Sequence, residues 1–321
     1  MILRGDPFGW EVPAEATAVA IGVFDGVHLG HQRVVRDLAT TASGRGLVTA
    51  ALTFDPHPLE FLAPERAPQM LTTVEQRAAM LGECGVEILG VLPFLEIRDL
   101  DPHTFVTEIL VLRLRAAVVA VGENFRFGRD RGGDAVLLRS MGDELGFTVE
   151  IVEMVDDAGE GGSISSTRIR DLLHSGDVQG AARLLGRPFA LIGPVIHGDA
   201  RGRTIGFPTA NLHVPDRMVV PADGVYAAWV EWNGVKYPGV VNIGVRPTFG
   251  VSQRTIEAHV IGFDADLYGE SLTLHFVDRI RAERRFDGID ALVAQIGRDR
   301  DQASVLLAEG DDSPGNVEVV S

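Results

Sequence analysis

Lysine and cysteine are almost absent from this chain of 321 residues. Lys236 is the only lysine, so nearly all of the positive charge is carried by arginine, whose planar guanidinium suits bidentate contacts to phosphate. No Gly-x-x-x-x-Gly-Lys-Ser/Thr sequence occurs, which excludes an ordinary P-loop enzyme. The single cysteine, Cys84, excludes an internal disulfide and a multi-cysteine zinc site, and we interpret it as a small apolar residue near a helix end.

Excess positive charge and long apolar runs are also missing. The formal charge of -16 argues against DNA or tRNA as the main ligand, because such a partner is held by neutralising its phosphates. No run of about 18 apolar residues and no basic leader followed by an apolar core is found. We therefore expect no membrane partner and a cytoplasmic location. The length allows two globular domains, each with its own core.

The first half of the chain alternates between strand and helix patterns. Strands are predicted at 17–21, 47–54, 86–92, 116–122 and 147–155, and helices at 33–42, 72–82, 102–115 and 134–145. Thr72-x-x-Glu75 has the form of a capping box at the start of one helix. This alternation predicts a Rossmann-like α/β domain with a doubly wound parallel sheet, whose ligand site lies beyond the carboxyl ends of its strands.

The pattern changes near Phe189 to short strands and turns. Strands are predicted at 191–197, 225–232, 235–241, 255–261 and 271–277, with Asn233-Gly234 as a hairpin signal between two of them. The second domain is therefore predicted to be a small antiparallel β-barrel, closed by a terminal helix at 289–306. We place the domains at 1–186 and 187–308, and the polar residues 309–321 are expected to form a disordered tail.

Gly22 to Gln32 follows the first buried strand and carries two histidines. A strand that breaks on glycines and restarts as a helix at Gly30 presents free N–H groups to a phosphate. His28 and His31 would then donate hydrogen bonds to charge developing on an α-phosphate during in-line attack. Either histidine alone would more commonly be a helix cap, but the whole constellation favours catalysis.

A second group of phosphate-binding candidates lies at 164–170. Hydroxyl groups at a helix start and two arginines could hold a leaving pyrophosphate, or the segment could be a plain N-cap with solvated arginines. The preceding residues 157–163, rich in glycine, serine and acids, are expected to form a mobile loop. The presence of the two histidines upstream favours the functional interpretation.

The glycine-rich segment 193–212 predicts another polyphosphate site, with charge from Arg201 or Arg203, although it could also be a simple turn. Thr209 and Asn211 would share one face of an extended strand and offer hard oxygen ligands for Mg²⁺. Glu257, between apolar neighbours in a strand, is either a paired structural acid or a general base. Residues 241–249 are expected to supply another loop near it.

Six motifs in order resemble those of the bacterial bifunctional riboflavin kinase/FMN adenylyltransferases, over roughly residues 17–306. They are the segments at 22–31, 53–58, 164–170, 202–212, 242–249 and 266–270. The first contains His-x-Gly-His, which resembles the signature of the nucleotidyltransferase superfamily. One departure is Asn124, where many relatives have aspartate.

The resemblance implies phosphorylation of riboflavin to FMN by ATP, followed by adenylylation of FMN to FAD with release of pyrophosphate. It implies an adenylylation site at His28, His31, Asn124, Ser166, Thr167 and Arg170, and a kinase site in which Thr209 and Asn211 hold Mg²⁺-ATP and Glu257 is the base. Further nucleotide or flavin contacts are expected at Gly22, Phe24, Asp25, Gly30, Arg126, Gly198, Arg203 and Gly206. Riboflavin, FMN and ATP are thus the expected partners, with Mg²⁺ as cofactor.

Two other function classes remain open at this stage. A different His-x-Gly-His enzyme, such as a cytidylyltransferase or a pantetheine-type adenylyltransferase, would leave the barrel domain unexplained. A non-catalytic flavin-binding regulator would be expected to have lost His28, His31 or Glu257. All three residues are present.

Overall fold

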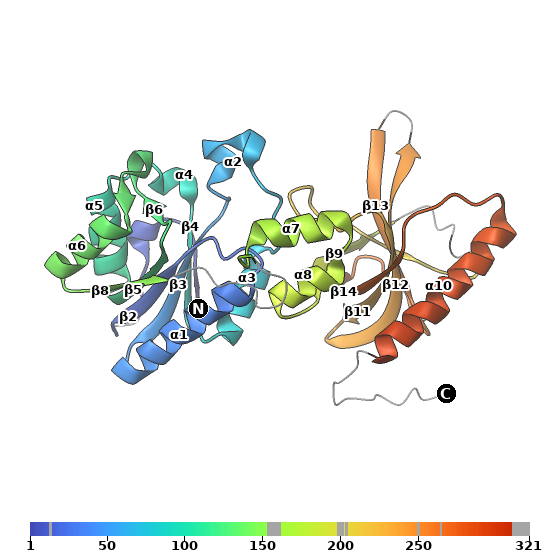
Figure 1. Ribbon diagram of the computed structural model, residues 1–321, viewed down its shortest axis with the longest axis horizontal. Helices are drawn as coiled ribbons and strands as arrows, with labels where there is room; N and C mark the ends of the chain where they lie inside the picture. Colours follow the sequence, from blue (N-terminus) through green and yellow to red (C-terminus); the bar gives the residue numbers. More distant parts are fainter. Residues whose placement is uncertain are drawn as a thin grey trace. The chain divides into compact units, whose positions relative to one another are not determined.

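The structure, a computed structural model, describes residues 1–12, 15–152, 162–197, 202, 205–248, 251–263 and 265–309. The chain divides into two compact units, Met1–Ser166 and Thr167–Ser321 (Figure 1). The domain boundary after residue 186 stays a prediction, and the tail beyond 309 and most of the loop at 157–163 lie outside the described residues. Within the described ranges, no helix combines the length and apolarity that crossing a bilayer requires.

The first unit is built on a six-stranded sheet in the order β1-β4-β3-β2-β5-β8, and every neighbouring pair is parallel. Its strands are β1 (Ile2–Leu3), β2 (Thr17–Ile21), β3 (Val48–Phe54), β4 (Ile88–Leu92), β5 (Ala116–Gly122) and β8 (Thr148–Val152). The strand order reverses at β2, because β3 follows on one side and β5 on the other. The predicted doubly wound sheet is confirmed, and this reversal is where such sheets bind ligands.

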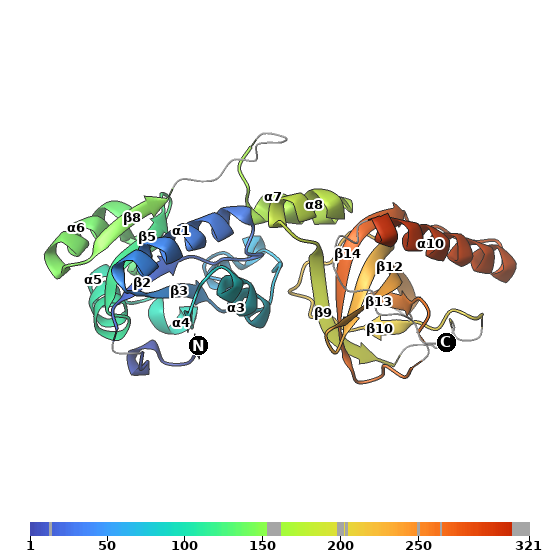
Figure 2. The ribbon, with the colours of Figure 1, turned by 90° about the horizontal axis from the view of Figure 1, so that it is seen from below.

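Helices cover both faces of this sheet. α1 (Leu29–Arg45) and α3 (Val74–Glu83) bury apolar side chains on one face, while the π-helix η3 (Phe105–Arg113) and α6 (Ala135–Leu145) do so on the other. The ribbons of α1, α3 and α6 are labelled in Figure 2. The short elements of this unit are η1 (Pro7–Gly9), α2 (Leu59–Leu62), η2 (Pro64–Arg66), α4 (Phe94–Ile97), α5 (Pro102–Thr104), β6 (Arg126–Phe127), η4 (Arg129–Arg131) and β7 (Gly133–Asp134).

Two details of the predicted helices are wrong. The capping box of α3 lies one residue later than predicted, because Thr73 caps the helix and exchanges hydrogen bonds with Gln76. The Thr72 hydroxyl instead donates a hydrogen bond to the carboxylate of Asp25, in the loop after β2. The predicted helix 102–115 is a short α5 followed by η3, a π-helix. Hydrophobic periodicity alone does not distinguish a π-helix from an α-helix.

The second unit contains a closed antiparallel barrel in the order β10-β13-β12-β11-β14-β9, as predicted. The strands are β9 (Phe189–Ile196), β10 (Ala210–Leu212), β11 (Gly224–Trp232), β12 (Val235–Thr248), β13 (Val251–Val260) and β14 (Ser271–Arg281). Asn233 and Gly234 form the expected hairpin, with φ values of 51° and 79°. The predicted loop at 241–249 is wrong up to residue 248, since β12 continues to Thr248 and pairs with β13.

Among the described residues, the longer helices of the barrel unit are α7 (Ser166–Ser175), α8 (Val178–Leu185) and the terminal α10 (Ile289–Glu309). Only the first residue of α7, Ser166, falls in the first unit. α10 lies across β11, β12 and β14 (Figure 1). Ala303 and Leu307 of this helix are buried against Val225 and Val240. The space between α10 and the barrel face is therefore partly filled by apolar side chains.

Candidate active sites

The loop after β2 has an unusual backbone. Phe24 and Val27 have φ values of 51° and 39°, in a region that side chains other than glycine rarely adopt, and Gly26 lies between them at 79°. For a β-branched residue such as Val27 this conformation costs roughly 1–3 kcal/mol, and it persists only where the surroundings hold it. The contacts of this loop therefore show which groups hold the strained backbone in place.

Asp25 anchors this loop from within. Its carboxylate is 2% exposed and accepts hydrogen bonds from the backbone of Leu71 and Thr72, at 3.0 and 3.1 Å, and from the Thr72 hydroxyl at 3.2 Å. The same hydroxyl accepts from the Gly26 amide at 3.0 Å. Asp25 thus ties the loop after β2 to the start of α3.

We expect Asp25→Ala to lower the free energy of unfolding of the first unit by about 3 kcal/mol. The substitution leaves two buried backbone N–H groups of Leu71 and Thr72 without their charged acceptor. Asp37→Ala is a matched control, because Asp37 is 62% exposed and forms a surface pair with Arg33 on α1. Urea unfolding of both variants measures the difference, and equal losses would contradict this role for Asp25.

Arg77, which the sequence analysis missed, fastens the ends of two strands. This arginine of α3 is 1% exposed, and its Nη1 donates to the carbonyls of Val23 and Phe54 and to the hydroxyl of Thr53 at 2.7 Å. The sequence feature that could have indicated this role is an arginine on the apolar face of a predicted helix. Its contacts hold the carboxyl ends of β2 and β3 together.

His28 and His31 lie at the N-terminus of α1 as predicted, although the helix starts at Leu29 instead of Gly30. His28 is the N-cap: its Nδ1 accepts a hydrogen bond from the His31 amide at 3.3 Å, which leaves the ring proton of the neutral form on Nε2. The two rings stack with centroids 3.6 Å apart, and Phe24 meets His31 edge-on. Capping and catalysis are therefore compatible roles for His28.

The electrostatic environment keeps His31 neutral. Burial lowers the pKa of His31 well below its usual range, and the neighbouring His28 lowers it further. Among the described residues, its buried Nδ1 has no hydrogen-bond partner. A buried polar atom without a partner is uncommon in a native structure and fits a site that is completed by a ligand.

A cavity of about 400 Å³ opens beside this loop at the carboxyl ends of β2 and β5. Three of the predicted residues, Gly22, Asn124 and Arg126, line it together. Its aromatic lining consists of Phe54, Phe94, Phe105, Phe125 and Phe127. His28 and His31 do not line it, and Phe24, Asp25 and Gly30 are buried in the adjoining loop and helix start. The cavity suits a flat, largely apolar ligand with a polar end.

Ser166 joins this region because its hydroxyl donates to the Asp25 carbonyl at 2.9 Å. Its presence at a helix start confirms the predicted position of α7. Thr167 and Arg170 follow in the same helix but are grouped with the second unit.

In the barrel, strand register places Glu257 between two asparagines. Asn211 of β10 is its partner on one side and Asn242 of β12 on the other. Partners in adjacent strands share a face, so the three polar side chains form one row. Asn242 was missed as a site residue, because its segment was interpreted as a loop.

Two cavities lie on either side of Thr209, which lines both. One, of about 490 Å³, extends over β10 and β13 to Asp266 and Tyr268. The other, of about 290 Å³, lies between the barrel and α10 and contains Asn242 and Glu257. Gly206 lies in an exposed turn with a φ of 86°, while Gly198 and Arg203 lie outside the described residues.

The oxygen atoms near Glu257 fit Mg²⁺ better than a transition metal. No cluster of three or more histidine, cysteine or acidic residues that could hold a metal is found in the described part of the chain. Thr209 and Asn211, two residues apart, offer a hydroxyl and an amide oxygen beside a carboxylate. Magnesium is usually bound by such a sparse oxygen set together with substrate phosphates and water.

Comparisons with known proteins match both halves of the chain. A family model described as FAD synthetase matches residues 11–168, and one described as riboflavin kinase matches 185–307. The bifunctional riboflavin kinase/FMN adenylyltransferase of Escherichia coli K12 is 40% identical over 300 residues, which cover 93% of this chain and 95% of the relative. This chain belongs to that bifunctional family.

Other relatives agree with this assignment. The Bacillus subtilis bifunctional riboflavin kinase/FMN adenylyltransferase is 38% identical and covers 89% of this chain and 91% of its own. A solved structure described as a macrolide-efflux protein from Streptococcus pneumoniae is 34% identical, with a TM-score of 0.84 over 95% of this chain and 98% of that one. The similarity therefore extends through both units.

Proposed function

We propose that this chain phosphorylates riboflavin to FMN and then adenylylates FMN to FAD, using one ATP in each step. The observation that carries the proposal is that both family matches fall in one chain and that each contains a cavity beside the residues its chemistry requires. Riboflavin, FMN and ATP are its substrates. We propose Mg²⁺ as the metal and the cytoplasm as the location.

In the adenylylation step, FMN occupies the cavity lined by Gly22, Asn124 and Arg126, with its ring among the phenylalanines. The FMN phosphate attacks the α-phosphorus of ATP, and pyrophosphate leaves. The N-terminus of α1 and the two histidines stabilise the charge that develops on the α-phosphate. Asp25, Phe24 and Gly30 act by shaping this loop, and Ser166, which donates to the Asp25 carbonyl, helps to bind the leaving pyrophosphate. Thr167 and Arg170 remain predicted pyrophosphate ligands from the sequence.

In the kinase step, riboflavin occupies the cavity beneath α10, and ATP lies in the larger cavity next to it. Thr209, which lines both, and Asn211 hold Mg²⁺, which would draw negative charge from the transferring phosphoryl group. Glu257 accepts the proton of the riboflavin 5′-hydroxyl as its oxygen attacks the γ-phosphorus. Gly198, Arg203 and Gly206 belong to the loop proposed to contact the ATP phosphates.

Product analysis tests this proposal directly. We expect the purified chain, incubated with riboflavin, ATP and Mg²⁺, to yield FMN, FAD, ADP and pyrophosphate. FAD formation from FMN without riboflavin phosphorylation would indicate a single nucleotidyltransferase. Flavin binding without turnover of either substrate would indicate a non-catalytic regulator and overturn the proposal.

We also expect the two activities to reside in separable parts of the chain. A fragment from residue 187 should phosphorylate riboflavin and make no FAD, because its cavities lie wholly within it. A fragment from residue 167 should do the same with a higher melting temperature, since it retains α8, whose Leu184 and Leu185 are buried, and the contact of Arg279 with the Ser175 carbonyl. If both soluble fragments lack kinase activity, the independence of the domains is contradicted.

A further inference from the structure

α10 carries a buried acid on its apolar face. Leu292, Ile296, Asp299, Ala303 and Leu307 recur at helical spacing, and Asp299 is 2% exposed. Neither step of the proposed reaction uses this carboxylate. A charge at such a position requires partners, because desolvating it alone is costly.

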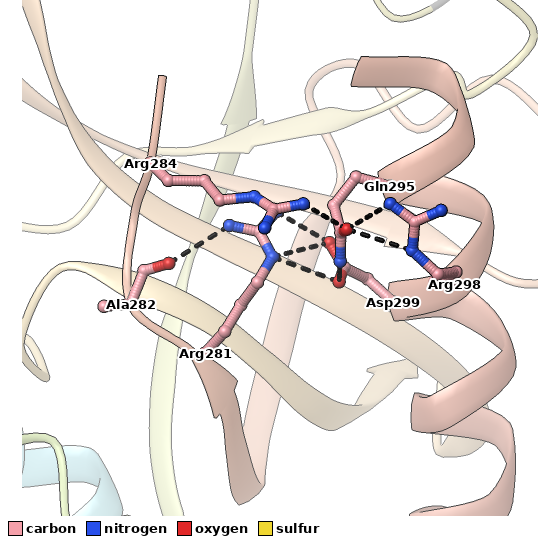
Figure 3. A network of polar contacts seen from close by, with 6 residues as sticks. All are labelled: Arg281, Ala282, Arg284, Gln295, Arg298 and Asp299. Atoms are coloured by element: carbon pink, nitrogen blue, oxygen red, sulfur yellow. Dashed lines mark hydrogen bonds and ion pairs between the residues drawn. The ribbon is translucent and has the colours of Figure 1, made fainter. Parts of the chain in front are cut away.

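Those partners come from the end of β14 and from α10 itself (Figure 3). Arg281 donates from Nε to both carboxylate oxygens, at 3.1 and 3.0 Å, and from Nη2 at 2.7 Å. Gln295 donates to Asp299 at 2.6 Å and accepts hydrogen bonds from Arg284 and Arg298. The carboxylate is thus the centre of a network that joins a barrel strand, the following segment and the helix.

The network lies along one wall of the cavity between the barrel and α10, which is the cavity proposed to bind riboflavin. Residues 282–288 connect β14 to α10, and Glu283, Arg284 and Phe286 of this segment line that cavity. Leu292 and Ile296, two turns and one turn before Asp299, line it as well, as do Arg281 and Asp299 themselves. Arg281 and Arg284 both lie over the Phe286 ring, at 5.7 and 4.8 Å from its centre.

Stability alone does not account for this arrangement. Replacing a buried ion pair by apolar residues of similar volume is often neutral or stabilising, so such a pair contributes little net free energy of folding. A bidentate pair does fix orientation, because the planar guanidinium and the carboxylate meet in one geometry. The geometry it fixes here is that of the helix and segment facing Glu257 across the cavity.

We propose that Asp299 is a positioning residue for the flavin substrate. Through Arg281 and Gln295 it holds α10 and residues 282–288 against the barrel, so that the cavity is already shaped to bind riboflavin. This inference rests on the proposed kinase activity. Its effect falls on riboflavin binding, while the ATP cavity, which contains neither Asp299 nor Arg281, is unaffected.

Asp299→Asn in the full-length chain tests the proposal. The substitution keeps the size of the side chain and removes its charge, so Arg281 and its segment lose their fixed geometry. We expect the KM for riboflavin to rise about tenfold, with kcat, the KM for ATP and FMN adenylylation within about twofold of the parent. Asp301→Asn is the matched control, because Asp301 lies on the same helix, 70% exposed, in a surface pair with Arg300, and should change nothing.

A double variant, Arg281→Met with Asp299→Leu, separates positioning from packing. We expect its melting temperature to equal or exceed that of the parent, while riboflavin binding, measured by quenching of flavin fluorescence, stays weakened about tenfold. Parent-like riboflavin affinity in the double variant, or in Asp299→Asn, would overturn the proposal. Riboflavin binding is measured apart from turnover, so the two proposals can fail separately. A parent chain that binds riboflavin without phosphorylating it would contradict the proposed function. The affinities of the parent and the variants for riboflavin would still test the role of Asp299.

Discussion

Glu257→Gln should lower riboflavin phosphorylation by about 10²- to 10⁴-fold, the usual contribution of a positioned general base. A primary alcohol is a poor nucleophile at neutral pH, and the carboxylate accepts its proton as the phosphoryl group transfers. Glutamine preserves the size of the side chain in its row between Asn211 and Asn242, and its amide oxygen can still accept the hydrogen bond of the Thr255 hydroxyl, 3.5 Å from Oε1 in the parent. We therefore expect kcat to fall while ADP binding changes little.

The same purified variant supplies its own control. FMN adenylylation takes place in the first unit, and a parent-like rate there would show that the protein is folded and that the defect is local. Phosphorylation of riboflavin near the parent rate would contradict the assignment. Glu257 would then be a structural acid of the barrel, and another group would accept the proton.

His28→Ala and His31→Ala should each lower FAD formation from FMN by about 10²-fold or more, the scale of losing one preorganised donor to a developing charge. The expected loss is in kcat, because the charge on the α-phosphate develops only as the reaction proceeds. The low pKa of His31 implies that this residue acts as a neutral imidazole near pH 7. Steady-state assays with FMN and ATP measure the effect.

His28→Asn distinguishes catalysis from helix capping. Asparagine is among the best N-cap residues, so this variant retains the cap of α1 and removes the imidazole, with its Nε2 donor and its stacking on His31. We expect it to unfold like the parent and to be as inactive in adenylylation as His28→Ala, with riboflavin phosphorylation intact in both. Parent-like FAD formation in His28→Asn would show that His28 serves only as a cap.

Local patterns in the sequence predicted the parts of the fold that depend on neighbouring residues. The buried strand ending at Ile21, the histidines at the start of α1 and the Asn233-Gly234 turn are each encoded within a few positions, so periodicity and turn chemistry were sufficient. The same local view misplaced the α3 cap by one residue. Thr72 and Thr73 are both good caps, and only the distant Asp25 decides between them.

The supporting residues of both sites depend on contacts between distant segments. Asp25 and Leu71 are 46 positions apart, and Arg77 reaches strand ends that only the folded sheet brings together. Asn242 becomes a neighbour of Glu257 through barrel register, and Asp299 looks like one more polar residue of an exposed helix until its pairing with Arg281 is known. The reactive groups could be predicted from local sequence patterns, whereas the residues that orient them can be identified only from the tertiary structure.

A mixing experiment tests the central claim that one chain carries two successive reactions at separate sites. Glu257→Gln and His31→Ala are each incubated with riboflavin, ATP and Mg²⁺, alone and together, and the flavins are separated over time. We predict that the first variant alone makes almost no FMN or FAD, that the second alone accumulates FMN, and that the mixture converts riboflavin to FAD. FAD production from riboflavin by either variant alone at the parent rate would contradict the claim, as would a mixture that accumulates FMN without converting it.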